Sequence, residues 1–270
     1  MRYAILTVGT HLTSKNQSKM NDLLSVLQPT DFRFLAGIME SPFNLSNDAK
    51  FTDLVGALEK EDTKEGRDAV QTEFVSNLRY LGSSDFAYAF RSVTGSEPGV
   101  SFQEIVRDVA GGLKVANPAA ATPREMVEKV ATDYATQQFA HLSVEEQQKM
   151  LEELGVEKEK AAAFLKRSAG VFALPMLIEA FNIVVVQGLI KTIIFGTIAK
   201  IIGSQLAGKL FTFLVGRMPW WVSWIGPAAW TLSIGWTTID LQGPARRKTI
   251  PIVLYLGLCS LRERLPQSSK

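Results

Sequence analysis

The sequence predicts an all-α fold, a multi-helix soluble bundle followed by a long apolar helical hairpin near the carboxyl end. Helix start signals recur before residue 168, apolar side chains repeat there at helical spacing, and the block that follows is almost free of charge. The 270 residues, 46% of them hydrophobic, are enough to bury a sizeable core. Intrinsically disordered and miniprotein classes are therefore excluded.

Charge divides the chain into three predicted segments. Residues 1–167, with 19 basic and 24 acidic side chains, form the predicted soluble helical domain. Residues 168–245, with 4 basic and 2 acidic side chains, form the apolar Trp-rich hairpin, and residues 246–270, with 6 and 1, form a basic C-terminal helix and tail. Because the formal net charge is only +2, no nucleic-acid partner is predicted.

The first segment carries signals for helix starts and stops. A hydroxyl followed three residues later by Glu is the capping-box pattern, which satisfies two backbone amides at a helix start. It occurs at Ser101 and Glu104, at Thr122 and Glu125 with Pro123 between them, and at Ser143 and Glu146. Pro118 marks a linker and Gly155 a helix end. Apolar residues at helical intervals predict the buried faces, for example Val70, Phe74, Leu78 and Leu81, or Ile105, Val109 and Leu113.

Strand-forming residues gather in two stretches, Met1–Val8 and Ile252–Leu258. Neither stretch has an identifiable pairing partner elsewhere in the sequence. The first also lacks the long apolar core and small-residue cleavage site of a secretory signal, so a signal peptide is not expected.

The first arm of the predicted hairpin begins at Pro175 and continues as one helix to about Leu214, with apolar residues on every side. Such a helix belongs either in lipid or deep inside a protein. Three lysines interrupt it, and their long stems favour amines that extend to water or to lipid headgroups. They are Lys191, Lys200 and Lys209.

The second arm, Met218–Ile239, is 22 residues without a charge, which as one helix would reach ~33 Å. Gly226 and Pro227 interrupt it, so a broken or re-entrant helix fits as well as a straight span. Aromatic and basic residues mark both ends, as they do at membrane interfaces. The alternative is a core hairpin wrapped by the amphipathic helices of residues 1–167.

These features define the predicted membrane-binding residues, which are the cations and tryptophans of the last two segments. They are Lys191, Lys200, Lys209, Arg217, Trp220, Trp221, Trp224, Trp230, Trp236, Arg246, Arg247 and Lys248. Two acids are candidates for a switch. Glu179 is either a buried relay or a carboxylate that favours the helix dipole, and Asp240 either latches Arg246 and Arg247 or lies in a solvated turn.

No pattern in the sequence points to catalysis. The chain lacks a nucleophile elbow, a zinc spacing and a phosphate-binding glycine loop, so we expect no enzyme activity and no cofactor. The single cysteine, Cys259, cannot form an intramolecular disulfide and is expected to be inert in its apolar run. Two histidines, His11 and His141, cannot build a histidine-rich metal site.

Several stretches resemble the YaaW family of bacterial proteins. They are Gly82–Asp85, Ser101–Asp108, Ser143–Leu151 and Gly243–Pro251, the last followed by an apolar helix. The family has been grouped loosely with ubiquinol-cytochrome c assembly chaperones. The resemblance implies a helical bacterial protein with a membrane-linked role and no catalytic residues.

We therefore expect a cytoplasmic protein that associates with the inner membrane and inserts or docks its apolar hairpin, in the manner of a pore-forming or membrane-perturbing protein. Its expected partners are lipids of an anionic leaflet, with self-association or a membrane-protein partner as further options. The alternative is an assembly chaperone or adaptor for a membrane protein.

Overall fold

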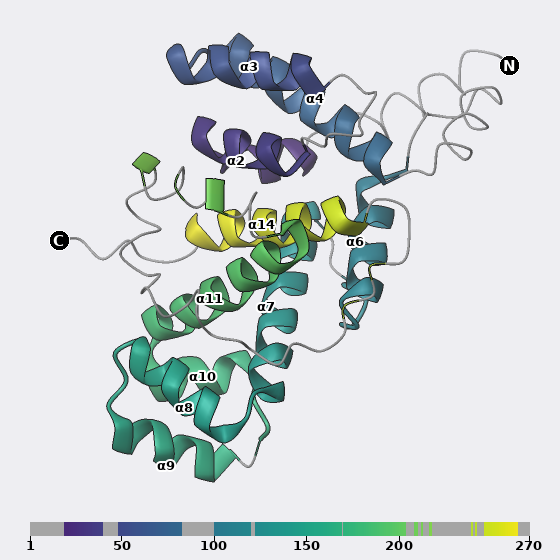
Figure 1. Cartoon of the computed structure of the whole chain (residues 1–270). Helices are drawn as coiled ribbons and strands as arrows, with labels where there is room; N and C mark the ends of the chain where they lie inside the picture. Colours follow the sequence, from purple (N-terminus) through teal and green to yellow (C-terminus); the bar gives the residue numbers. More distant parts are fainter. Residues whose placement is uncertain are drawn as a thin grey trace, which may run out of the picture.

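The computed structural model of the chain describes residues 19–39, 48–82, 100–119, 122–168, 170–203, 208–209, 212, 216–217, 239, 241 and 246–263. All regular structure within these ranges is helical, which confirms the predicted all-α class (Figure 1). Apart from Ile239, the second arm of the predicted hairpin lies outside the described residues together with all five tryptophans, as do Asp240 and Met1–Val8. The long helices are α2 (Pro29–Met39), α3 (Asp48–Lys60), α4 (Lys64–Leu81), α6 (Phe102–Gly112), α7 (Pro123–His141), α8 (Val144–Glu153), α9 (Lys158–Ser168), α10 (Leu174–Phe181), α11 (Ile183–Ile202) and α14 (Arg246–Glu263).

The helices of the first segment begin where local chemistry places them. All three predicted capping boxes are present, at the starts of α6, α7 and α8. At α6 the Ser101 amide donates to the Glu104 carboxylate at 2.7 Å, and the Glu104 amide donates back to the Ser101 hydroxyl at 3.3 Å. Helix α8 ends at Glu153, two residues before Gly155, and Pro118 lies in the linker between α6 and α7. The predicted starts and stops are confirmed.

The predicted apolar faces are also confirmed. In α4 the residues Val70, Phe74, Leu78 and Leu81 are all buried. In α6 the buried face includes Ile105 and Val109, and Leu113 follows it into the core. These faces form because residues three and four apart lie on the same side of a helix.

Helix α14 lies at the centre of the fold. It packs against α2, α6, α7 and α11, and Figure 1 shows it crossing the middle of the molecule. Every residue from 249 to 260 is buried. The stretch Ile252–Leu258, although rich in strand-forming residues, is therefore helical and lies within α14. Helices surround it on all sides, and burial of its branched side chains outweighs their weak preference for strands.

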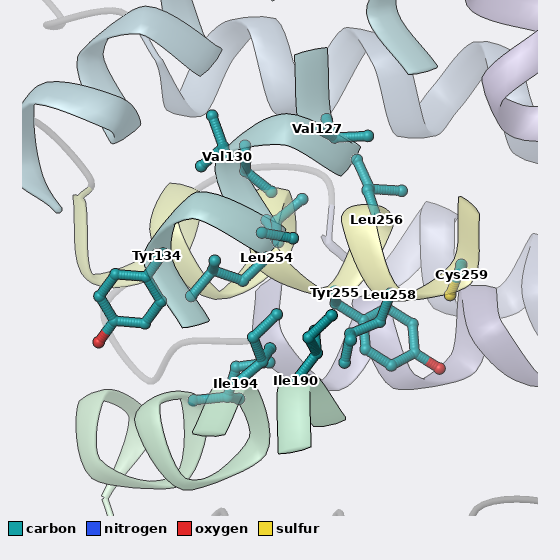
Figure 2. Packing of buried hydrophobic residues seen from close by; sticks show 14 of the residues in the cluster. Val127, Val130, Tyr134, Ile190, Ile194, Leu254, Tyr255, Leu256, Leu258 and Cys259 are labelled. Atoms are coloured by element: carbon teal, nitrogen blue, oxygen red, sulfur yellow. The ribbon is translucent and has the colours of Figure 1, made fainter. Parts of the chain in front are cut away.

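A glycine brings α14 close to α7. A Cβ atom built on Gly257 would stand 2.6 Å from the Val127 carbonyl oxygen and 2.6 Å from the Ala131 Cβ. Any larger residue would push the two helices apart, since a backbone atom cannot move without its helix. Figure 2 shows the resulting packing, with α14 between Val127, Val130 and Tyr134 of α7 and Ile190 and Ile194 of α11.

The first arm of the predicted hairpin is two helices and not one. The backbone at Asn182 has a φ of 75°, which separates α10 from α11. The Asn182 side chain then caps α11, because its Oδ1 accepts from the amides of Val184 and Val185 at 2.9 and 3.2 Å. Helix α11 ends at Ile202, before Gly203 at a φ of 85°. The predicted continuation of one helix to Leu214 is wrong.

One apolar core unites the described helices. It draws on residues from each of the three predicted segments, such as Phe34, Phe195 and Tyr255, whose rings contact one another. Helix α11 contributes 11 buried residues out of 20. The apolar block that follows residue 168 is thus partly built into the body of the protein.

An amphipathic cavity and the predicted membrane-binding residues

A cavity of about 550 Å³ opens between α7, α10, α11 and α14. This volume falls within the ~300–1,000 Å³ typical of small-molecule pockets in proteins. One wall is apolar and comes from three helices. Its residues are Leu174 and Ile178 of α10, Ile183, Val186 and Ile190 of α11, and Leu258 and Leu261 of α14.

The opposite wall is the polar face of α7. Helical spacing gathers its side chains on one side, because they recur at intervals of three and one residues. They are Glu125, Glu128, Lys129, Thr132 and Asp133. The same spacing on α11 adds Gln187 and Lys191 beside its apolar residues. The cavity therefore has both apolar and charged lining residues.

The acids of the α7 wall are engaged within the protein. The Glu128 carboxylate accepts from the Ser260 hydroxyl at 2.6 Å and from Arg124 Nε at 3.3 Å. Asp133 pairs with Lys129 at 2.8 Å. Glu125 accepts from the Thr122 amide at 3.1 Å, as its capping role requires. Each carboxylate on this wall therefore has a nearby positive or hydrogen-bonding group.

Two cations stand at the α11 and α14 side of the cavity. Burial and, to a lesser extent, repulsion from the Arg262 guanidinium together lower the pKa of Lys191 to about 8. The sequence predicted that Lys191 would extend to water or to headgroups. It is instead half-buried and lines the cavity.

Arg262 belongs to a buried network around Asp31, a residue with 0% exposure. The Asp31 carboxylate accepts from Arg262 Nη2 at 2.9 Å, from the Tyr255 hydroxyl at 2.8 Å and from the Gln28 amide at 2.7 Å. Burial and the neighbouring Asp31 charge raise the pKa of Tyr255 well above its usual value. The network ties α14 to the start of α2.

Cys259 lies one turn from this network and is fully buried. Burial and the Asp31 charge raise the pKa of its thiol well above the ordinary value of 9.0. The thiol therefore stays protonated at neutral pH, which makes it a poor nucleophile. Within the described residues no group of three or more His, Cys, Asp or Glu side chains is placed to hold a metal ion.

The predicted basic residues divide into two sets. Lys200, Lys209, Arg217 and Arg247 are exposed. Arg246 instead binds the body of the protein, because its guanidinium donates to the Asp108 carboxylate at 2.7 and 3.1 Å.

Lys248 likewise donates to the Met39 carbonyl oxygen. Among the three cations of residues 246–248, Arg247 is thus the one with an exposed side chain. The proposed latch between Asp240 and the two arginines cannot be placed, because Asp240 lies outside the described residues.

Both interpretations of Glu179 require correction. Its side chain is exposed, so it is not a buried carboxylate relay. It also lies in the last turn of the short helix α10, whose first turn holds no acid, so it does not stabilise the amino end of that helix. The break at Asn182 ends α10 after eight residues, which places Glu179 near its carboxyl end, where a carboxylate does not favour the helix dipole.

Among the described helices, α11 is the one long and apolar enough to cross a membrane. Yet 56% of its most apolar window is buried inside the protein. Its Thr197 hydroxyl also forms a buried hydrogen bond with the Tyr134 hydroxyl at 3.0 Å, and burial raises the pKa of Tyr134 to about 12. These contacts are those of a core helix.

Comparison with known proteins reveals a distant relationship. The chain is 25% identical over 197 residues to a UPF0174 protein of Helicobacter pylori (strain J99 / ATCC 700824), and the match covers 72% of each chain. No family profile matches the chain, and no solved structure matches it. The similarity is distant and carries no site residues with it.

The cavity and the Asp31 network both escaped the sequence analysis. Lys191, in the middle of an apolar helix, was a usable signal, since a buried lysine needs a polar surrounding. Asp31 gave no such signal, because an acid in the first turn of a helix is ordinarily a solvated partner of the helix dipole.

Proposed function

We propose that this protein docks on the surface of an anionic membrane, with a folded helical body that holds the apolar segment 204–245 against the bilayer. The observation that carries this proposal is the way α11 and α14 flank the segment. Both helices are parts of one core, so the body holds the chain on either side of the segment, at Ile202 and at Arg246, and Ile239 and Leu241 also pack against that core.

The two flanking helices run in opposite directions where they pack. Lys191 lies near Arg262, and Phe195 contacts Tyr255. Residue numbers therefore rise along α11 in the direction in which they fall along α14. Figure 1 agrees with this arrangement. The carboxyl end of α11 and the amino end of α14 therefore lie toward the same side, and the body can present the intervening segment from one face.

The chemistry of this segment suits a membrane interface. It contains all five tryptophans of the chain, and residues 218–239 carry no charge. Tryptophan favours the headgroup region, where its apolar ring and polar N–H are both satisfied. The exposed cations Lys200, Lys209 and Arg217 lie beside or within it, and each could add ~1 kcal/mol of attraction to an anionic surface.

Docking is favoured over insertion of the whole hairpin because α11 is part of the core. Moving α11 into lipid would remove 11 buried residues from their neighbours and break the Thr197–Tyr134 hydrogen bond. A hydrophobic helix gains little by exchanging one apolar surrounding for another, so this exchange has no evident driving force.

Vesicle flotation tests the proposal with the full-length protein. We expect it to float with vesicles that contain phosphatidylglycerol, and to float less with pure phosphatidylcholine vesicles. Because every tryptophan lies in the segment, a blue shift and quenching by brominated lipids would report insertion of that segment alone. Absence of flotation at both pH 7 and pH 5 would contradict the proposal.

A matched set of variants distinguishes the effect of the cations near the segment from the effect of the total charge of the protein. Replacing Lys200, Lys209 and Arg217 by Gln should weaken flotation with anionic vesicles severalfold. Replacing three exposed lysines of the body, Lys149, Lys158 and Lys160, should leave it unchanged. Release of dye from vesicles, with equal flotation of the two sets of variants, would favour a pore. A stable stoichiometric complex with a membrane protein would favour the chaperone alternative.

A further inference from the structure

The cavity between α7, α10, α11 and α14 is a second candidate site. Within the part of the chain that the structure describes, its lining residues belong to these four helices. Its apolar wall runs along α10 and α11 and continues onto α14, and its volume of about 550 Å³ suits one compact ligand. An occupant needs a continuous hydrocarbon part, because that wall offers no hydrogen-bonding side chain.

The charged end of the cavity indicates the other half of the occupant. Lys191 and Arg262 both line it, and their charges repel each other across the space. The facing carboxylates of Glu125, Glu128 and Asp133 are already engaged with groups of α7 and α14. Arg262 keeps its pair with Asp31, so an incoming anion would act mainly as a counter-ion for Lys191.

We infer that this cavity binds a single-chain fatty acid, with its acyl chain along the apolar wall and its carboxylate beside Lys191 and Arg262. A carboxylate accepts charge-assisted hydrogen bonds from ammonium and guanidinium groups, and these are the stronger hydrogen bonds of proteins. The binding does not require the membrane-docking function and goes beyond it.

The inference has a pH dependence that follows from Lys191. The charged groups around it are Glu125, Glu128, Lys129 and Asp133 from α7 and Arg262 from α14, with Asp31 behind Arg262, while α10 contributes only apolar side chains. A bound carboxylate favours protonated Lys191. Affinity should therefore be highest between the pKa of the ligand's carboxyl group and pH 8, and it should fall as the pH rises past 8, where the amine of the free protein loses its proton.

Calorimetric titration of the full-length protein with dodecanoate, below its micelle-forming concentration, tests the inference without any variant. We expect saturable one-to-one binding, and binding of dodecanol that is about tenfold weaker, because the alcohol lacks the charge. Dodecanol that binds equally well, or dodecyltrimethylammonium that binds better, would overturn the assignment of an anionic headgroup.

Variants with matched controls locate the binding site. Lys191→Gln should weaken dodecanoate binding about tenfold and remove its pH dependence, whereas Lys200→Gln, exposed on the same helix, should change neither. Ile178→Trp should fill the cavity and block binding. Met176→Trp, on the same helix but outside the cavity, should not.

Two further outcomes would contradict the assignment of the binding site to this cavity. Unchanged dodecanoate binding in folded Lys191→Gln and Ile178→Trp proteins would place the ligand elsewhere. Loss of binding after replacement of Trp220, Trp221 and Trp224 by Ala would assign it to segment 204–245. Circular dichroism checks whether each variant is folded. If a variant does not fold, the comparison of dodecanoate with dodecanol on the unaltered protein still tests the inference.

Discussion

Helices α11 and α14 are both apolar and central, yet they are held in different ways. Helix α14 is enclosed from residue 249 to 260, and its polar side chains Tyr255, Ser260 and Arg262 all bind partners on other helices. Helix α11 has the composition of a membrane span and is enclosed on part of its surface, with a cavity along the rest. Apolar composition alone therefore does not distinguish a core helix from a membrane helix.

The largest expected effect comes from the network that holds α14. Asp31→Ala removes the carboxylate that Arg262 and Tyr255 share in the interior. Breaking a buried ion pair by removing one partner costs about 3–5 kcal/mol, so urea unfolding should show a loss of that order. Asp108→Ala breaks the partly exposed pair with Arg246 and should cost no more than about 1 kcal/mol. Equal losses would show that burial of the Asp31 network is unimportant.

A second prediction compares side-chain truncation in the two helices. Leu254 of α14 has 0% exposure and is surrounded, whereas Ile190 of α11 is buried but lines the cavity. Leu254→Ala should therefore cost about 2–5 kcal/mol of unfolding free energy, and Ile190→Ala should fall at the lower end of that range. Chemical denaturation of both variants measures the difference. A larger loss at Ile190 would mean that the cavity is closed around a tightly packed side chain.

The close approach of α14 to α7 provides a third and smaller effect. Gly257→Ala places a methyl group against the Val127 carbonyl oxygen, and overpacking of this kind costs about 1–3 kcal/mol. Gly111→Ala is the control, since a Cβ there meets nothing within 4 Å. It should raise the stability by up to ~1 kcal/mol through helix propensity, and thermal unfolding should show opposite shifts for the two variants.

The smallest predicted effect is a pH dependence of opposite sign in the two helices. The pKa of Lys191 is lowered from 10.5 to about 8, so between these values the unfolded chain binds the extra proton and stability rises with pH. The pKa of Cys259 is raised above 9.0, so as the pH passes 9.0 the unfolded thiol ionises first and stability falls.

Difference curves isolate these two contributions. The stability of the wild type minus that of Lys191→Met should rise from pH 8 upward, and the wild type minus Cys259→Ala should fall from pH 9. Lys200→Met, which removes an exposed lysine of the same helix, is the control. A flat curve for Lys191→Met would show that the folded protein leaves the Lys191 amine unperturbed.

Sequence patterns predicted the helices more fully than the site. The capping boxes at Ser101, Thr122 and Ser143 and the buried face of α4 were predicted correctly, because they rest on contacts within four residues of the chain. The continuous helix from Pro175 to Leu214 was not, because Asn182 adopts a positive φ that its residue type permits without requiring.

What the sequence determined by itself is the class of fold, the helix boundaries marked by capping and the concentration of tryptophan in one uncharged segment. The tertiary structure alone decided which apolar helix is enclosed, where the cavity opens and which charges meet. Asp31 and Arg262 are separated by 231 residues and Asp108 and Arg246 by 138. Burial and pairing at such distances depend on neighbours that no local pattern identifies, since the same apolar run is stable in lipid or in a protein core.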